Sequence, residues 1–285
     1  MSWEKLIKEN KPLVITGTIN AYTALLAERA GIKAIYLSGG GVANASYGLP
    51  DLAMTSREDV LEDVRRIRSA SDLPLLVDID TGWGSALAIS RSIKEMISAG
   101  ASGVHIEDQV SEKRCGHRPN KEIVSSEEMV DRIKAAKDAQ TDDNFLLMAR
   151  TDAFAKGGLQ EVIDRSNAFI EAGAGAIFPE AISSLKDYEE ISKNVSKPIL
   201  ANITEFGMTP LFSHNELAKA GVKIVLHPLS AFRAMSKAAE KVYATLASGG
   251  DHEGLLEKMQ SRDELYDVLD YHMYEEKIDK LFEKN

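Results

Sequence analysis

The chain has 285 residues, of which 44% are hydrophobic, a formal net charge of −10 and one cysteine. The single Cys115 excludes a disulfide framework and a cysteine-rich zinc site, the acidic balance argues against nucleic acid as a partner, and no apolar run reaches the roughly 20 residues of a membrane helix. The polar start lacks the apolar stretch of a signal peptide, so we expect a soluble, cytoplasmic protein that can bury a large core.

Eight short apolar runs recur along the chain, and each is followed by a polar residue. They are too short for helices, and their nearly continuous apolarity is typical of parallel strands that are buried on both faces. We therefore expect strands at residues 13–15, 34–37, 75–79, 103–106, 145–149, 176–178, 199–201 and 223–226.

Ala-Gly pairs end several of the helical patterns between these runs, since glycine can adopt the left-handed conformation that stops a helix. Eight parallel strands with helices between them predict an α/β protein with a closed (β/α)₈ TIM-type barrel. An open doubly wound sheet is the alternative. It usually has fewer strands and a glycine-rich fingerprint after the first, which Thr16-Gly17-Thr18 does not supply. The pairs are Ala30-Gly31, Ala99-Gly100, Ala172-Gly173 and Ala220-Gly221.

The pattern becomes purely helical after residue 230. No linker or change in composition divides the chain before that point, so we expect one barrel domain over residues 1–285, with extra C-terminal helices as an extension from about residue 250. Tyr266, Tyr271, Met273 and Tyr274 give the extension an apolar stripe. The stripe either packs on its own barrel or contacts another copy of the chain.

Polar side chains stand at the ends of nearly all the expected strands, and several of them are acidic. Barrel topology brings the carboxyl ends of the strands into one ring, where barrels place their active sites. Acids that converge there would repel one another, so a cationic group should lie among them. Two long connections, residues 38–56 and 108–125, leave from the same face and are candidate lids or binding loops.

Asp78 and Asp80 are the most informative pair. Residues i and i+2 of a strand face the same side, so both carboxylates are expected to point at one spot. The alternatives are solvated loop acids or caps for the following turn. Paired carboxylates suit a hard cation such as Mg²⁺, which keeps several waters, and Glu107 on the next strand could hold those waters.

Further strand ends offer contacts to an anionic substrate. Arg150 could clamp a carboxylate in a bidentate fork, or it could form a structural salt bridge with an acid such as Glu180. Asn202 and Thr204 share the i, i+2 spacing and could hydrogen-bond a second carboxylate, although Asn202 alone could cap a loop.

The second long loop contains Cys115 within the basic segment Lys113-Arg114-Cys115-Gly116-His117-Arg118. Neighbouring cations lower the pKa of a thiol and make it reactive, and they also match a polyanionic substrate. An inert cysteine in a basic loop is the alternative. The place of the loop over the barrel mouth favours a functional thiol.

The segment Lys113-Arg114-Cys115-Gly116-His117 resembles the Lys-Lys/Arg-Cys-Gly-His signature of the isocitrate lyase and phosphoenolpyruvate mutase superfamily. The resemblance covers essentially the whole chain, and the motifs follow in the same order. Further matching segments are residues 36–40, 49–51, 77–82, 105–109, 149–152, 178–180, 202–207, 229–234 and 262–266.

The resemblance implies a Mg²⁺ ion, with Mn²⁺ as the alternative, held by Asp78 and Asp80 directly or through water, with Asp51 and Glu107 in the outer shell. It also implies that Cys115 donates a proton as a thiol. The base is left open, and Tyr36, at a strand end, is a candidate. Substrate is expected at Ser38, Gly39, Gly40, Asp80, Cys115, Gly116, His117, Arg150, Glu180, Asn202, Ile203, Thr204, Arg233 and Arg262.

The reaction implied is a magnesium-dependent retro-aldol cleavage of 2-methylisocitrate to pyruvate and succinate, as part of propionate breakdown through the methylcitrate cycle. Phe178, Leu226 and Pro228 could form the pocket for the methyl group. The family is typically tetrameric, and some members exchange C-terminal helices between subunits. Cleavage of isocitrate and hydrolysis of oxaloacetate are alternative reactions. A phosphonate mutase is a further alternative, but Cys115 argues against it because the mutase lacks the thiol signature. A non-catalytic protein that binds metal or polycarboxylates is the alternative from another class.

Overall fold

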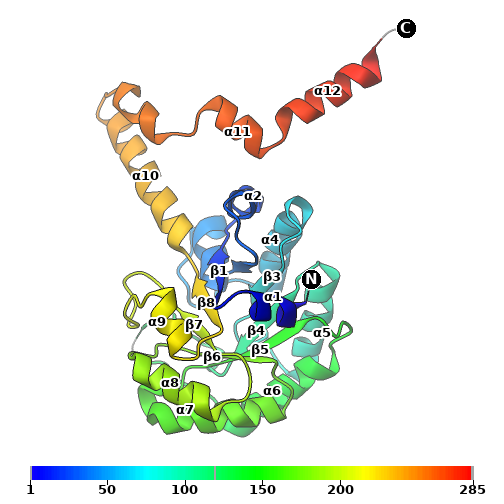
Figure 1. Cartoon of the computed structure of the whole chain (residues 1–285), viewed down its shortest axis with the longest axis vertical. Coiled ribbons are helices and arrows are strands. Elements are labelled where there is room, and N and C mark those ends of the chain that lie inside the picture. The colour runs from blue at the N-terminus through cyan, green and yellow to red at the C-terminus, as the bar shows by residue number, and fades with distance from the viewer. Residues whose placement is uncertain (1, 119, 284–285) are drawn as a thin grey trace. The chain divides into compact units, whose positions relative to one another are not determined.

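The computed structural model describes residues 2–118 and 120–283. Eight parallel strands form one sheet in the order β6-β5-β4-β3-β2-β1-β8-β7 (Figure 1). Every strand expected from the apolar runs is present, with small shifts at its ends. The strands are β1 (Leu13–Gly17), β2 (Ile35–Leu37), β3 (Leu75–Asp78), β4 (Gly103–Glu107), β5 (Leu146–Thr151), β6 (Ala176–Pro179), β7 (Leu200–Asn202) and β8 (Ile224–His227).

The two outer strands of this order, β6 and β7, meet and close the barrel. An isolated parallel bridge joins Ile177 to Ile199, and the backbone N–H of Ile177 donates to the carbonyl of Pro198 at 2.9 Å. The expected (β/α)₈ barrel is therefore confirmed, and the open doubly wound sheet is excluded. The β6–β7 seam has fewer paired residues than the other strand contacts.

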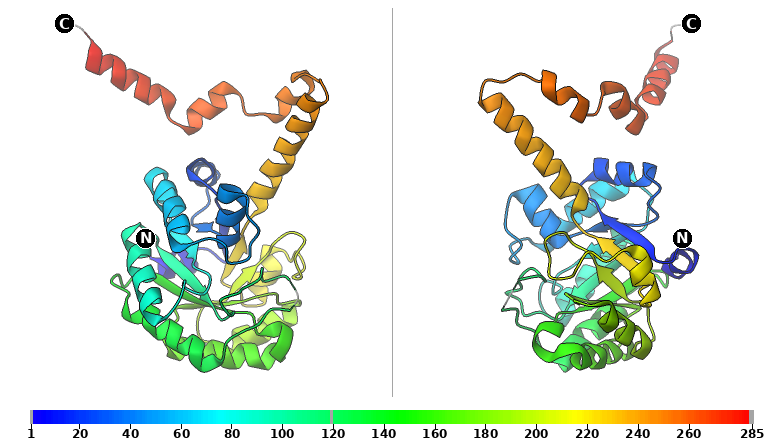
Figure 2. Two further views of the ribbon diagram at one scale, coloured as in Figure 1. Left: turned by 180° about the vertical axis from the view of Figure 1, so that it is seen from behind. Right: turned by 60° about the vertical axis from the view of Figure 1, so that its left-hand side comes forward.

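Helices follow the strands and surround them, and Figure 2 shows the same arrangement from behind and from the side. The Ala-Gly pairs end helices as expected. Their glycines have φ values of 86° (Gly31), 93° (Gly100), 118° (Gly173) and 89° (Gly221), which lie in the left-handed region that favours glycine. The helices of the barrel are α1 (Trp3–Glu9), α2 (Ala21–Arg29), α4 (Arg57–Ala70), α5 (Ala86–Ser98), α6 (Ser126–Asp138), α7 (Phe154–Glu171), α8 (Leu185–Asn194) and α9 (His214–Lys219).

Two apolar layers hold the barrel together. One fills the inside of the ring of strands, with Tyr36, Met148 and Leu226 among its members, and the other lies between the strands and the outer helices. Trp3 of α1 belongs to the inner layer, and its Nε1 donates to the carbonyl of Ser102 at 2.8 Å. Each large apolar side chain in these layers contributes roughly 1.5–3 kcal/mol by its burial.

The two long connections differ in structure. The first contains a short helical turn, α3 (Gly39–Gly41), that runs into a π-helical turn, η1 (Val42–Ser46). The second carries Cys115 and is mostly irregular, apart from an antiparallel bridge between Gln109 and Ile123 at its base.

The chain divides into two compact units, residues 1–232 and 233–285. The second unit contains most of α10 (Ser230–Ala247), then η2 (Glu253–Lys258), α11 (Arg262–Val268) and α12 (Tyr271–Phe282). The rings of Tyr266 and Tyr271 stack with their centroids 4.1 Å apart. The division into one barrel domain with an extension from about residue 250 stays a prediction. None of the described helices combines the length and apolarity needed to span a membrane.

Candidate active site

Three buried carboxylates meet where β3 and β4 end. Asp78 is the last residue of β3, Asp80 follows closely after it, and Glu107 ends β4. One oxygen from each of the three lies within 4.8 Å of the others, and all three residues are buried. A cluster of oxygen ligands of this kind can hold a hard divalent cation.

The two aspartates converge for a reason that the strand pattern did not provide. β3 ends at Asp78, and Asp80 has a left-handed backbone conformation with φ 48°, so alternation along a strand does not apply to it. The chain turns instead, and the backbone N–H of Asp80 donates to Oδ1 of Asp78 at 3.0 Å. The expected convergence is present, but a turn produces it.

Burial opposes the charge of all three carboxyl groups. Burial, reinforced by Asp78, raises the pKa of Asp80, and burial raises that of Glu107 well above its ordinary value. At Asp78 the effect of burial is outweighed by His105 and Lys113, so its pKa is lowered. Oε1 of Glu107 has no hydrogen-bond donor among the described residues. A divalent cation would engage these oxygens and favour their ionised forms, so the residues fit a metal.

Lys113 supplies part of the positive charge that the acidic ring requires. Its Nζ lies 2.5 Å from Oδ1 of Asp51 and 2.7 Å from Oδ1 of Asp80. Burial opposes its charge, but Asp80, Glu107 and Asp51 outweigh it and raise the pKa of the amine. Asp51 thus contacts the acidic cluster through Lys113.

Arg150 supplies further positive charge to the acidic ring, and its guanidinium lies near three acids. Its Nη1 lies 3.0 Å from Oε2 of Glu107, and its Nε lies 3.0 Å from Oδ2 of Asp152 and 3.7 Å from Oε2 of Glu180. These contacts are the structural salt bridges that the sequence analysis gave as the alternative role of Arg150. A guanidinium has five N–H donors, so these bonds leave room for a substrate carboxylate.

Tyr36 and His105 form a buried pair beside Asp78. The Tyr36 hydroxyl lies 2.9 Å from Nε2 of His105 and 3.4 Å from Oδ2 of Asp78, and the two rings stack. Burial lowers the pKa of His105 to about 4, so the imidazole is neutral at pH 7 and can accept a hydrogen bond from the phenol. Burial and then Asp78 raise the pKa of Tyr36. Tyr36 is therefore a phenol at rest, and its role as the base stays a hypothesis.

Cys115 is half-buried in the loop at the barrel mouth. Burial raises the pKa of its thiol; a backbone N–H of His117 opposes this, and Asp51 reinforces it. The basic loop does not lower the pKa of the thiol, because burial dominates and acids balance Lys113 and Arg150, as a thiol that donates a proton requires. The protonated thiol is the form that can donate a proton.

His117 fixes Glu180 at the same mouth. Nδ1 of His117 accepts the backbone N–H of Met208 at 3.0 Å, so Nε2 carries the proton and lies 2.7 Å from Oε1 of Glu180. Nδ2 of Asn202 also donates to this oxygen at 3.3 Å. Burial would raise the pKa of Glu180, but Arg150 and His117 outweigh it and lower it to about 2. Glu180 is thus a fixed carboxylate.

The structure places the other expected substrate residues in two groups. The backbone N–H of Gly39 donates to Oδ2 of Asp78 at 3.0 Å, and a Cβ on Gly40 would lie 3.0 Å from Cγ of Asp51, so both glycines allow a close approach of the backbone to the acids. Ser38, Ile203 and Thr204 also follow their strands at this mouth. Arg233 and Arg262 belong to the second unit, and their roles stay predictions.

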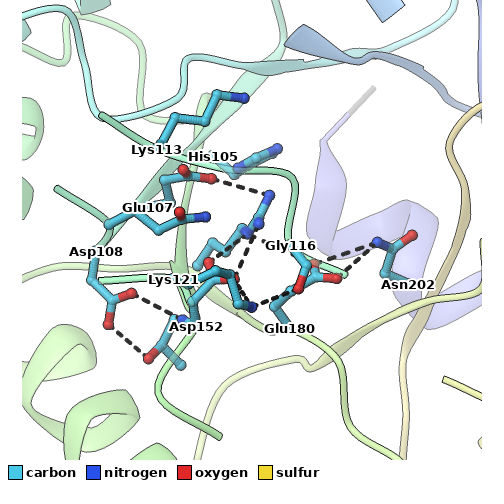
Figure 3. A network of polar contacts seen from close by, with 12 residues as sticks. His105, Glu107, Asp108, Lys113, Gly116, Lys121, Asp152, Glu180 and Asn202 are labelled. Atoms are coloured by element: carbon cyan, nitrogen blue, oxygen red, sulfur yellow. Dashed lines mark hydrogen bonds and ion pairs between the residues drawn. The ribbon is translucent and has the colours of Figure 1, made fainter. Parts of the chain in front are cut away.

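Sequence reasoning assigned no role to Lys121, Asp152 or His105. Figure 3 draws all three near Glu107 and Glu180, and the ion pairs of Asp152 with Lys121 and Arg150 belong to this network. Asp152 and His105 lie inside segments that match the superfamily, which was a signal for their importance. Lys121 had no such signal, because a lone lysine in a loop is ordinarily solvated.

A cavity of about 630 Å³ lies at the opposite face of the barrel, lined by Trp3 and Lys8 of α1, by Leu146 at the start of β5, and by Pro198 before β7. It contains none of the clustered acids. Barrel enzymes place their chemistry at the carboxyl ends of the strands, so we assign the candidate active site to the mouth that holds Cys115.

Comparison with known proteins identifies the group to which the chain is related. A sequence model of the phosphoenolpyruvate phosphomutase family matches residues 3–247. The chain belongs to this family. A 2-methylisocitrate lyase of Vibrio cholerae is 59% identical over 282 residues, which cover 97% of this chain and 92% of the relative. A 2-methylisocitrate lyase of Escherichia coli (strain K12) is 59% identical over 281 residues, with 98% and 95% covered.

Solved structures of the family share the fold. An oxaloacetate acetylhydrolase in complex with the inhibitor 3,3-difluorooxalacetate is 27% identical, with a TM-score of 0.89 and coverage of 98% of this chain and 95% of that one. A 2,3-dimethylmalate lyase, described as a PEP mutase/isocitrate lyase superfamily member, is 30% identical, with a TM-score of 0.84 and coverage of 97% and 93%. The superfamily resemblance of the chain is thereby confirmed.

Proposed function

We propose that this chain is a carbon–carbon lyase that cleaves 2-methylisocitrate to pyruvate and succinate. The observation that carries the proposal is the half-buried Cys115 thiol on a loop whose neighbouring residues contact Asp80 on one side and Glu180 on the other. The names of relatives that are 59% identical support this substrate.

We propose Mg²⁺, or Mn²⁺ in its place, as the ion, with Asp78 and Asp80 as its ligands and with Glu107 and Asp51 in the outer shell. The oxygen-only cluster and the bare Oε1 of Glu107 support this assignment. When bound, the ion would lower the pKa of the substrate hydroxyl and neutralise the neighbouring carboxylate.

The chain's own groups would bind the substrate and move its protons. Arg150 and Asn202, with the backbone N–H groups near Gly39 and Gly40, offer donors to its carboxylates, and His117 holds Glu180 in place beside them. Loss of the hydroxyl proton starts a retro-aldol cleavage that releases pyruvate and leaves the electron pair of the broken bond on the succinate half. The Sγ–H of Cys115 donates the proton that completes succinate.

A further group must take the hydroxyl proton of the substrate. Tyr36 is our candidate, because its hydroxyl lies 2.9 Å from Nε2 of His105 and 3.4 Å from Oδ2 of Asp78. Its raised pKa requires that its proton leaves to solvent before the phenolate can act. Positive charge brought to the site with the cation would favour that loss.

The methyl group of the substrate would lie against apolar side chains at the base of the mouth. Phe178 and Leu226 are buried in the inner layer of the barrel together with Tyr36, and Pro228 follows β8. An apolar pocket distinguishes a substrate with one extra methyl group by roughly 10–200-fold. We therefore expect weak turnover of isocitrate.

We also propose that the protein works as a cytoplasmic homotetramer in propionate breakdown through the methylcitrate cycle, and that Arg233 and Arg262 contribute to substrate binding. The exposed apolar side chains of α12 support assembly into oligomers. The superfamily resemblance supports the tetramer and the pathway.

A pyruvate-coupled assay tests the proposed function. 2-Methylisocitrate and isocitrate are supplied side by side, with Mg²⁺ and with EDTA. We expect pyruvate from 2-methylisocitrate with Mg²⁺, much less product from isocitrate, and no turnover in EDTA until Mg²⁺ is restored. Pyruvate formed equally well in EDTA would remove the metal from the proposal. Saturable binding without any product would favour a binding protein, and oxaloacetate hydrolysis in a parallel assay would favour the hydrolase.

A further inference from the structure

Lys121 is a buried cation for which the proposed chemistry has no use. It comes from the far end of the loop that carries Cys115, and it is 6% exposed. Its Nζ donates to the carbonyl of Gly116 at 2.6 Å and forms an ion pair with Oδ1 of Asp152. Lys121 thus joins two parts of the same loop, because it binds the residue that follows Cys115. Through Asp152 it also joins the loop to the barrel.

Asp152 is a rigid anchor for this lysine. It follows β5, and its backbone N–H donates to Oδ1 of Asp108 at 2.9 Å. The other oxygen of Asp108 accepts the hydroxyl of Thr151 at 2.7 Å. The carboxylate of Asp152 also accepts Nε of Arg150 at 3.0 Å. The ends of β4 and β5 therefore hold Asp152 from both of its sides, as Figure 3 shows.

Gly116 lies directly against the site. A Cβ at this position would lie 2.4 Å from Nη2 of Arg150 and 2.6 Å from Cγ of Glu180. The carbonyl that Lys121 holds therefore belongs to the point where the loop touches the strand ends. An ion pair with Asp152 alone would not require that second bond.

The thiol lies between two lysine contacts of different kinds. Lys113, on one side of Cys115, pairs with Asp80 of the candidate metal cluster. Lys121, on the other side, pairs with Asp152, which is outside that cluster. The Lys121 contact therefore holds the loop independently of the contact between Lys113 and the acids.

We propose that Lys121 is a positioning residue that holds the Gly116 carbonyl, and with it the Cys115 thiol, in the arrangement needed to protonate the product half. This inference rests on the proposed lyase function for its catalytic consequence, but its structural part does not. Without the Nζ bond, the loop lifts from Arg150 and Glu180, the thiol becomes accessible to solvent, and the proton donor is misplaced.

The test uses the fact that Cys115 is the only thiol in the chain. The full-length protein and its Lys121→Met variant are alkylated with iodoacetamide across a range of pH, which separates a change in thiol pKa from a change in access. We expect the alkylation rate at high pH, where the thiol is fully ionised, to rise about tenfold, as for a locally opened segment. In the coupled assay we expect kcat to fall about 100-fold, with KM within about threefold of the parent.

Arg68→Met is the matched control. Arg68 is also a mostly buried cation, and its Nη1 donates to the carbonyls of Ser71 at 2.6 Å and Leu73 at 2.8 Å, before β3 and away from the Cys115 loop. This variant should lose thermal stability but keep the alkylation rate and kcat of the parent. Equal acceleration of alkylation in both variants would overturn the proposal, and so would an unchanged alkylation rate or kcat in Lys121→Met.

A second variant covers the case in which Lys121→Met does not fold. Lys121→Ala removes the Nζ bond without placing a long apolar side chain against Asp152, whose carboxylate stays paired with Arg150. It should show the same fast alkylation and low kcat. If the parent protein shows no lyase activity while alkylation of the variant is still accelerated, the proposed function fails and the role of Lys121 in holding the loop stands.

Discussion

The thiol of Cys115 remains protonated because burial raises its pKa, and this gives the first prediction at the scale of single residues. Cys115→Ser keeps the size of the side chain but replaces the thiol with a much weaker acid. We expect kcat to fall by about 10²–10⁴-fold, while the dissociation constant for 2-methylisocitrate, measured by calorimetry, stays within about threefold. Full turnover by Cys115→Ser would remove the thiol from the mechanism.

Gly116 gives a second prediction at this scale. In Gly116→Ala the added methyl group would lie 2.4 Å from Nη2 of Arg150 and 2.6 Å from Cγ of Glu180, and the ion pairs of these side chains resist displacement. We expect the loop to be pushed away and kcat/KM to fall about 100-fold. Gly254→Ala is the control, because a Cβ there meets nothing within 4 Å. Equal activity of the two variants would contradict the close contact.

How far the sequence predicts the site depends on the kind of information each residue carries. The acids at the strand ends could be found because barrel topology gathers them, and the basic loop identified Cys115. The residues that set the pKa of the thiol could not be found, because its burial and the pairing of Lys113 with Asp51 and Asp80 depend on the fold. Lys121 was missed because nothing in its neighbours along the chain indicates that Asp152 lies beside it.

At the scale of elements, two imidazoles join the start of α9 to the end of β8. Nε2 of His214 and Nε2 of His227 lie 2.9 Å apart, so one nitrogen donates a proton and the other accepts it. Burial and then His214 lower the pKa of His227 below its ordinary 6.5. The stability that this pair contributes is therefore present above pH 6.5 and is lost as the pH falls below that value.

His227→Gln tests this contribution. We expect the urea midpoint of the parent to fall between about pH 7 and 5, and the fall to be smaller in His227→Gln. His272→Gln is the control, since His272 is exposed on α12 and contacts Glu275. If both variants show the parent's pH dependence, the pair contributes nothing to the linkage between protonation and folding.

The elements themselves were largely predictable, because buried parallel strands and glycine-terminated helices leave strong local patterns. The eight strands and the glycines at the helix ends match the expectation. The turns at Gly39–Gly41 and Val42–Ser46 could not be predicted. They depend on tertiary contacts, such as the bond from Gly39 N–H to Asp78, that join residues far apart in the sequence.

At the scale of the whole molecule, α12 exposes more apolar surface than an isolated chain normally tolerates. Tyr274, Ile278, Leu281 and Phe282 are each more than half exposed, and such patches mark contact surfaces. We expect light scattering to give a mass that is a multiple of 31.2 kDa. Ile278→Asp with Leu281→Asp should shift the protein to smaller species, and Lys280→Asp on the same helix should not. A monomeric parent protein would contradict the proposed assembly.

The seam between β6 and β7 determines where the barrel is expected to open locally. Glu180 and Asn202 lie above its two sides and hydrogen-bond across it, while below them an isolated bridge joins the strands. Fluctuations that separate neighbouring strands should therefore start at this seam. The amide of Ile177 should exchange with deuterated solvent before the amides inside β4. A bound polycarboxylate that contacts both Glu180 and Asn202 would hold the two strands together. Substrate should therefore slow hydrogen exchange at the amide of Ile177, which it does not contact.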